Sequence, residues 1–430
     1  ITPRDPIMEV EPAAIAASLP DDLLLEILVH VKDEAALFRS ATVCKRWLRL
    51  ITDRWFLRRR WPQYSPSSFV GFFTRGNRHG EPDEGSLPGP EPCFIPARRS
   101  ALGPCRRSLG SFVTSAHAGL FNGALPLISR HGLVVVRLEA HDSTGYPDRT
   151  IFQLGVCNLH AATCVMLPPL KVSPNFYCYD CNGYAILTGV DFCSKDALTP
   201  TLQPSNPLSF FKVIIIGYTS DDLKYNLYTF SSDKSSWDER TNCFDGDAQS
   251  YDYGSFSDAI VHNGLAHWIF HNYGEGCLQV TNLNAKTGHI SLTKLPLKLN
   301  YQPTRPSCLT LGINGVLSLL WMQKEGSQLD IWEQREDQGN MRGTSEWLCT
   351  RTIELRQPVK NNEIRELLVL REKCGALLIS DNYGQVYATD LETGMMEKIV
   401  DWPSRRSICH WDSMLLEIDW PTIFISGLTK

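Results

Sequence analysis

The sequence predicts a multidomain α+β chain in which a small all-α unit is followed by an all-β domain. Near the N-terminus, apolar residues recur at the spacing of a helix, with Leu24, Ile27 and Leu28 as the clearest set. From about residue 111 onward, short apolar runs are separated by turn residues, which is typical of strands. The 11 Trp, 14 Tyr and 18 Phe residues also favour sheets, because aromatic side chains are enriched in strands.

Residues 18–62 form the predicted helical unit, and we expect residues 1–17 before it to be flexible. The expected helix starts are Pro20–Asp21, Asp33, Thr42 and Asp53. Proline suits a first helical turn, and acidic side chains suit the positive end of the helix dipole. A unit of this size cannot bury its apolar surface alone, so the need for a partner is the main functional indication.

Charge is distributed unevenly along this unit. Residues 1–34 hold eight acidic residues against two basic ones, and residues 35–62 hold eight basic residues against Asp53. Two interpretations remain open. The basic half is either a solvated face or a surface that steers an acidic partner toward the unit.

Residues 18–59 resemble an F-box. The family pattern is a Leu-Pro pair, an acidic pair, a Leu-rich helix, then Val-Cys-Lys-x-Trp and a closing Phe-Leu. The matching residues are Leu19, Pro20, Asp21, Leu24, Glu26, Ile27, Leu28, Leu37, Val43, Cys44, Lys45, Arg46, Trp47 and Phe56. The stretch His30-Val31-Lys32 departs from the pattern, because many relatives have a Leu before a proline-containing turn there.

The resemblance implies that the unit docks on the Skp-type adaptor of a cullin–RING ubiquitin ligase. The implied adaptor-binding residues are Leu19, Pro20, Leu24, Ile27, Leu28, Leu37, Val43, Cys44 and Trp47. The sequence leaves open which of them face the adaptor and which form the unit's own core, with Trp47 and Leu28 as the first core candidates. The double change Leu24→Asp with Ile27→Asp is predicted to abolish adaptor binding.

An internal repeat dominates the rest of the chain. A glycine followed by an apolar strand recurs five times, in steps of 51, 81, 51 and 60 residues. These glycines are Gly132, Gly183, Gly264, Gly315 and Gly375. A unit of about 50 residues is the size of a propeller blade. The region resembles the kelch-like and F-box-associated β-propellers that often follow an F-box in plant proteins, with about six blades, or seven if the longest step hides one.

The predicted propeller spans residues 111–430, and residues 63–110 are expected to be a linker. Residues 76–110 are rich in Gly, Pro and Arg, which indicates a mobile loop. Because an open ring would expose sheet edges, we expect residues 68–73 to pair with residues 414–418 and close a sixth blade. Polar residues at strand ends, such as Asn158, Asn282 and Asp390, precede the predicted turns.

No pattern in the sequence predicts a catalytic, cofactor-binding or metal site. Cys178 and Cys181 lack a second close pair, so a zinc site is not expected. His262, His267 and His271 do not have the spacing of a metalloprotease motif. The net charge of −5 favours neither nucleic acid nor a membrane surface as partner. Scattered cysteines and the absence of a signal peptide in residues 1–14 indicate reduced thiols in the cytoplasm or nucleus.

The function predicted from these features is that of a non-catalytic substrate receptor in a ubiquitin ligase. Two alternatives remain, an adaptor-binding scaffold without a degradation substrate and a propeller-type hydrolase. The substrate-binding residues are not identified by the sequence. Exposed aromatic residues are the usual interface anchors. The candidates are Trp237, Tyr251, Tyr253, Tyr273 and Tyr383, and the alternative for each is a place in the core of a blade.

Overall fold

The computed structural model divides into two compact units. It describes residues 19–31, 33–61, 69–74, 91–98, 100, 102–114, 119–138, 151–172, 182–192, 210–219, 224–240, 243, 254–262, 264–272, 274–298, 307–312, 316–323, 327–335, 346–356, 364–369, 376–381, 383, 385–401, 413–421, 424 and 428. One unit comprises residues 1–63 together with residues 420–430, and the other comprises residues 64–419.

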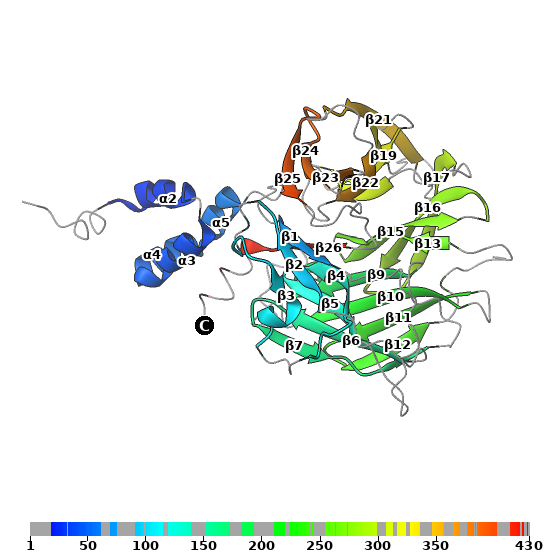
Figure 1. Cartoon of the computed structure of the whole chain (residues 1–430), viewed down its shortest axis with the longest axis horizontal. Helices are drawn as coiled ribbons and strands as arrows, with labels where there is room; N and C mark the ends of the chain where they lie inside the picture. Colours follow the sequence, from blue (N-terminus) through cyan, green and yellow to red (C-terminus); the bar gives the residue numbers. More distant parts are fainter. Residues whose placement is uncertain are drawn as a thin grey trace, which may run out of the picture. The chain divides into compact units, whose positions relative to one another are not determined.

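The first unit contains four described helices (Figure 1), which are α2 (Asp21–Val29), α3 (Glu34–Val43), α4 (Lys45–Ile51) and α5 (Arg54–Arg60). Two of the expected caps are confirmed, because the Asp33 carboxylate accepts the Ala36 N–H at 3.0 Å and the Asp53 carboxylate accepts the Trp55 N–H at 2.8 Å. The predicted start at Thr42 is wrong. Thr42 lies inside α3. This helix ends at Val43, and the extended residue Cys44 separates it from α4.

The helical unit has its own core, and a residue from the C-terminus completes it. Its buried apolar side chains include Leu24, Leu28, Leu37, Ala41, Leu50, Ile51, Phe56, Leu57, Trp61 and Phe424. The Phe424 ring lies 5.0 Å from the Trp61 ring and 5.2 Å from the Phe38 ring, centroid to centroid. The expectation that the propeller runs to residue 430 is therefore wrong, because residues 420–430 cluster with the helices.

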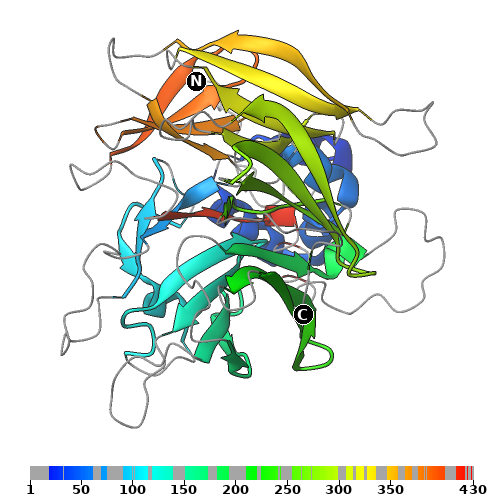
Figure 2. The same ribbon diagram turned by 90° about the vertical axis from the view of Figure 1, so that its right-hand side faces the viewer.

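The second unit is a six-bladed β-propeller (Figure 1, Figure 2). Blade 1 contains β4 (Leu125–Arg130), β5 (Leu133–Leu138), β6 (Ile151–Asn158), β7 (Thr163–Met166) and β8 (Leu170–Lys171). Blade 2 contains β9 (Gly183–Thr188), β10 (Phe211–Thr219), β11 (Lys224–Ser231) and β12 (Ser236–Arg240). Blade 3 contains β13 (Gly254–Phe256), β14 (Ile260–His262), β15 (Leu265–Asn272), β16 (Cys277–Asn284) and β17 (Ile290–Lys298).

The remaining three blades have four strands each. Blade 4 contains β18 (Ser307–Leu311), β19 (Leu317–Met322), β20 (Gln328–Arg335) and β21 (Glu346–Glu354). Blade 5 contains β22 (Ile364–Val369), β23 (Ala376–Asp381), β24 (Gln385–Asp390) and β25 (Met396–Asp401). Blade 6 contains β26 (Ser413–Glu417), β1 (Phe69–Thr74), β2 (Cys93–Pro96) and β3 (Arg107–Ser108). The first strands of neighbouring blades contact one another in turn from β26 through β4, β9, β14 and β18 to β22.

The predicted pairing that closes the ring is confirmed. Strand β1 pairs antiparallel with β26, and the partners include Phe72 with Leu415 and Phe73 with Met414. Gly71 sits in the same strand with φ +155°, and an added Cβ would lie 2.3 Å from the Ile95 carbonyl oxygen. Only glycine fits there, because the backbone of β2 passes so close.

Residues 93–96 and 107–108, which fall within the expected mobile loop, form the outer strands of this sixth blade. Strands β2 and β3 and the 3-10 helix η2 (Leu109–Phe112) all fall within or next to the predicted loop. The Cys93 N–H donates to the Thr74 hydroxyl at 2.9 Å, and the Phe94 ring packs edge-on against Phe112. The loop prediction is therefore wrong for these residues, since blade 6 needs outer strands that only this segment supplies.

The uneven glycine spacing has a simple explanation in the strand order. Gly132, Gly264, Gly315 and Gly375 precede β5, β15, β19 and β23, which are second in the spatial order of their sheets, whereas Gly183 begins β9, the innermost strand of blade 2. Gly183 thus lies one strand earlier in its blade than the other four glycines, and this contributes to the long step that follows it. The alternative of a seventh blade is wrong.

Polar residues organise the outer turns, largely where predicted. The Asn158 side-chain oxygen accepts the His160 and Ala161 N–H groups, both at 3.0 Å. The Asp390 carboxylate does the same for Glu392 at 2.7 Å and Thr393 at 3.0 Å. Such side-chain turns fix the outer hairpins of blades 1 and 5. In blade 3 the turn residue is Asn284 rather than the predicted Asn282, whose side chain instead meets His267.

Candidate functional site

The nine residues predicted to bind an adaptor separate into three groups by exposure. Leu24, Leu28 and Leu37 are 2%, 2% and 0% exposed, so they form the core that holds the helices together. The half-buried residues are Leu19 and Trp47, and the exposed residues are Pro20, Ile27, Val43 and Cys44. The exposed residues are the ones free to meet a partner directly.

Two further exposed apolar residues were missed by the sequence analysis. Leu23 is 49% exposed on α2 and Trp55 is 57% exposed on α5. Together with Ile27 (56%) and Val43 (69%) they form what we call the exposed apolar set. Leu23 and Ile27 are one helical turn apart, as are Leu24 and Leu28, and only packing shows which pair faces outward. Exposed large apolar side chains concentrated in a small unit indicate an interaction surface.

Many of the acidic and basic side chains of the helical unit pair with one another. Arg46 and Arg49 contact the Asp21 carboxylate at 2.8 and 3.0 Å, and Arg59 contacts Glu26 at 2.6 Å. The most buried of these pairs, Arg60 with Glu34, has side-chain exposures of 15% and 16% and a separation of 3.4 Å. Basic side chains of α4 and α5 thereby hold α2 and the start of α3, which leaves less positive charge for steering a partner.

Two of the aromatic candidates for target binding lie within the described residues. Trp237 is half-buried, packs on Phe230 and donates its indole N–H to the Pro168 carbonyl at 2.8 Å, so it is a structural residue. Tyr383 is 61% exposed in the β23–β24 turn. The buried Asp381 carboxylate shapes that turn, because it accepts the N–H groups of Tyr383 and Gln385, both at 2.9 Å. Tyr251, Tyr253 and Tyr273 lie outside the described residues.

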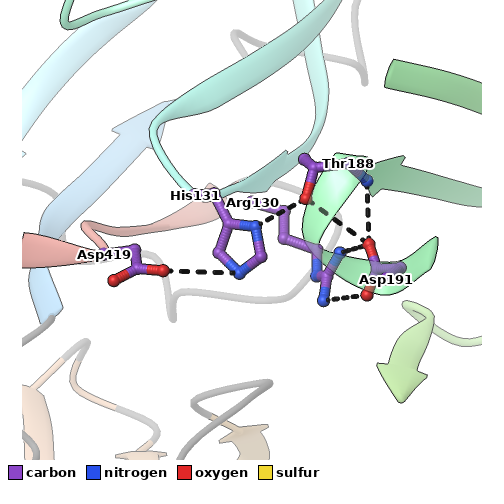
Figure 3. Close-up of polar contacts among 5 residues, drawn as sticks. All are labelled: Arg130, His131, Thr188, Asp191 and Asp419. Carbon is purple, nitrogen blue, oxygen red and sulfur yellow. Dashed lines mark hydrogen bonds and ion pairs between the residues drawn. The ribbon is translucent and has the colours of Figure 1, made fainter. Parts of the chain in front are cut away.

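A largely buried polar network joins three blades at the carboxyl ends of their first strands (Figure 3). Arg130 is the last residue of β4 and forms a two-pronged ion pair with Asp191, in which Nη2 lies 2.8 Å from Oδ1. His131 lies between the Thr188 hydroxyl at 3.0 Å and the Asp419 carboxylate at 3.9 Å. Burial alone raises the pKa of Asp191, but the Arg130 guanidinium and the Thr188 N–H outweigh it and hold that pKa below its ordinary value. The network ties blades 6, 1 and 2 together.

The histidines considered as ligands have structural partners. His267 is buried on β15, and its Nδ1 lies 2.7 Å from the Asn282 side-chain oxygen. Burial lowers the pKa of His267, which favours the neutral ring. His271 lies 3.4 Å from the Ser255 carbonyl oxygen. Within the described ranges, no group of three His, Cys, Asp or Glu side chains is arranged to hold a metal ion, and Cys178 and Cys181 lie outside those ranges.

The helices in the described part of the chain are too short or too polar to cross a lipid bilayer.

Comparison with known proteins identifies the helical unit. A family model described as F-box-like matches residues 16–61. No curated protein matches the chain.

Three solved structures match the chain at low identity and low TM-score. One comes from a study of two prolyl endopeptidases, with 10% identity, a TM-score of 0.32 and coverage of 92% of this chain and 56% of that chain. A protein from Lactobacillus plantarum gives 10% identity, a TM-score of 0.38 and coverages of 77% and 82%. Dipeptidyl peptidase 4 from Porphyromonas gingivalis gives 11% identity, a TM-score of 0.33 and coverages of 76% and 43%. Likenesses this weak carry no information about activity.

On the family match and the fold together, the chain is an F-box-like domain, at residues 16–61, joined to a six-bladed β-propeller.

Proposed function

We propose that this protein is the substrate-recognition subunit of an SCF-type (Skp–cullin–F-box) E3 ubiquitin ligase. The F-box-like domain docks on the Skp adaptor, and through it on the cullin and RING subunits, while the propeller binds a target protein. The observation that carries the proposal is the F-box-like match over residues 16–61 together with the exposed apolar set on the same helices.

The exposed apolar set explains how docking would be stabilised. Burying a Val, Leu or Ile side chain fully is worth about 1.5–3 kcal/mol, and Ile27 and Val43 still expose over half of theirs. Each therefore has on the order of 1 kcal/mol left to gain in an interface. Pro20, Cys44, Leu19 and Trp47 would add contacts around them, whereas Leu24, Leu28 and Leu37 support the surface from inside.

In this role the chain performs no chemistry of its own. The ligase's other subunits transfer ubiquitin, and this chain supplies proximity and orientation of the target. Its place of action is the cytoplasm, the nucleus or both, and neither nucleic acid nor membrane takes part. The kelch type of the blades and a plant origin stay predictions.

A docking test should change surface residues and leave the core intact. Leu24→Asp is unsuitable, because Leu24 is buried and its replacement would unfold the unit. Ile27→Asp combined with Val43→Asp removes apolar contacts and adds charges that an interface would have to desolvate. We expect adaptor binding to weaken by at least about 3 kcal/mol, on the order of 100-fold in Kd.

Met395→Asp is the matched control, because Met395 is 52% exposed but lies on the propeller. Affinity for a purified Skp-type adaptor should be unchanged in this control, and helical circular dichroism should be unchanged in all variants. A folded double variant that binds the adaptor as well as the original chain would refute the docking assignment.

Two alternatives give different results in further assays. A propeller-type hydrolase would show no adaptor binding at all. A scaffold without a degradation substrate would bind the adaptor, yet no protein captured by the propeller would be turned over faster in cells that carry the original chain than in cells that carry the Ile27→Asp/Val43→Asp variant.

A further inference from the structure

Two cysteines face each other across the β6–β7 hairpin of blade 1. Cys157 on β6 and Cys164 on β7 are register partners. Their sulfur atoms lie 3.4 Å apart, with the Cys157 thiol as hydrogen-bond donor. Both are thiols rather than parts of a disulfide. Opposed residues in antiparallel strands have Cβ atoms about 4.5–5.5 Å apart, and a disulfide needs about 3.5–4.5 Å, so a small approach of the two strands suffices.

The two thiols differ in the way that a reactive pair requires. Cys164 is partly exposed on the outer strand of the blade, next to the exposed Val165, whereas Cys157 is buried. The hydrogen bond from Cys157 lowers the pKa of the Cys164 thiol against the opposing effect of burial. The same hydrogen bond and burial raise the pKa of the Cys157 thiol. Cys164 is thus the thiol that meets solvent and loses its proton more readily, and Cys157 lies buried behind it.

The surrounding hairpin holds this pair in register. The Asn158 side chain fixes the turn between the two strands through two hydrogen bonds of 3.0 Å. Gly155, two residues before Cys157, leaves space for the second sulfur, because a Cβ at Gly155 would lie 3.1 Å from the Cys164 Sγ atom. A hairpin with a fixed turn keeps both sulfur atoms on one face of the blade.

We propose that Cys157 and Cys164 are a redox modification site, in which a peroxide oxidises the pair to a cross-strand disulfide. The Cys164 thiolate attacks one peroxide oxygen, the O–O bond breaks, and the departing hydroxide takes a proton from water. Cys164 is then a sulfenic acid. The Cys157 sulfur attacks the sulfenic sulfur, an S–S bond forms as the S–O bond breaks, and the thiol proton leaves with the hydroxyl as water. The two sulfurs lose two electrons, which the peroxide gains.

The tryptic cleavage sites in the sequence allow the proposed disulfide to be measured directly by mass spectrometry. Trypsin cleaves after Arg149 and Lys171, so a single peptide of residues 150–171 carries both cysteines and no other. The full chain is treated with graded hydrogen peroxide, its remaining thiols are alkylated in denaturant, and the digest is analysed without reductant. We expect this peptide to lose both alkylation sites together and to become lighter by two hydrogen atoms, with full reversal by dithiothreitol.

Cys349 serves as the internal control, because it is an exposed thiol on β21, the outer strand of blade 4. We expect its alkylation to need at least a tenfold higher peroxide dose before it declines. In Cys157→Ser, Cys164 should stop at the sulfenic acid and form a dimedone adduct. Cys157→Ala serves for the same measurement if the buried hydroxyl disturbs folding. Retention of both alkylated thiols in the 150–171 peptide at doses that oxidise Cys349 would overturn the proposal, and so would a Cys164 without a dimedone adduct in both variants.

Discussion

His160 should make the stability of the propeller depend on pH. Its side chain lies in the β6–β7 turn, and an added Cβ at Gly132 would lie 2.0 Å from its Nε2 atom, so the ring is packed closely against the neighbouring turn. Burial lowers the pKa of His160 from an ordinary value of about 6.5 to about 4, and the nearby His131 backbone and the Asp419 carboxylate oppose this only in part. The folded propeller therefore holds His160 neutral.

The sign of the effect follows from the lowered pKa. Between pH 6.5 and pH 4 the unfolded chain binds a proton at His160 that the folded chain does not bind, so the free energy of unfolding falls as the pH falls. The contribution is fully present above pH 6.5 and is lost by about pH 4. Each pH unit in this window is worth roughly 1.4 kcal/mol, which gives about 3 kcal/mol in total.

Urea unfolding of the full chain at a series of pH values measures this contribution. In His160→Gln the free energy of unfolding should change less steeply between pH 4 and pH 6.5, by up to about 1.4 kcal/mol per pH unit. His289, exposed in the corresponding turn of blade 3, is the control position. Parallel curves for the original chain and His160→Gln across this window would refute the reasoning.

Two further predictions concern single residues in the described fold. Gly394→Ala should destabilise blade 5 by several kcal/mol, because the new Cβ would lie 2.0 Å from the Glu354 carbonyl oxygen. Gly288→Ala is its control at the corresponding turn of blade 3, with a similar φ of +69° and nothing within 4 Å, so thermal unfolding should show only the strain of the left-handed backbone, about 1–2 kcal/mol. Phe424→Ala should cost the helical unit about 3–5 kcal/mol, measured as earlier loss of the helical circular dichroism signal on heating, while the β signal of the propeller should unfold as before.

Local signals in the sequence predicted the local structure well. Asp33 and Asp53 were recognisable as helix caps, because a capping side chain acts within three residues of itself. The closing pair of strands was also predictable, since a ring of sheets with an open edge is unfavourable whatever its exact sequence. The helix start predicted at Thr42 was wrong because the Thr42 hydroxyl donates to the Arg39 carbonyl oxygen inside α3. A threonine in the sequence looks the same whether it caps a helix or bonds to the preceding turn.

Features that depend on distant parts of the chain were not predictable. Leu23 and Leu24 are adjacent and equally apolar, and only the packing of α2 decides that the first is exposed and the second buried. Phe424 reaches the helical core from the opposite end of the sequence, with no periodic pattern around it. Strands β2 and β3 are short and lie in a Gly- and Pro-rich stretch, so their identity as strands comes from blade 6 and not from their own composition.

Blade 6 takes its first strand from residues 413–417 and its other strands from residues 69–108, and the helical core likewise takes Phe424 from beyond residue 419. During synthesis, β26 and Phe424 are therefore translated almost together, after most of the residues they pack against. A chain truncated before residue 413 would lack both β26, which closes the propeller ring, and Phe424, which completes the core of the helical unit. Such a fragment would expose unpaired strand edges, which makes it prone to aggregation and a target for chaperones or degradation.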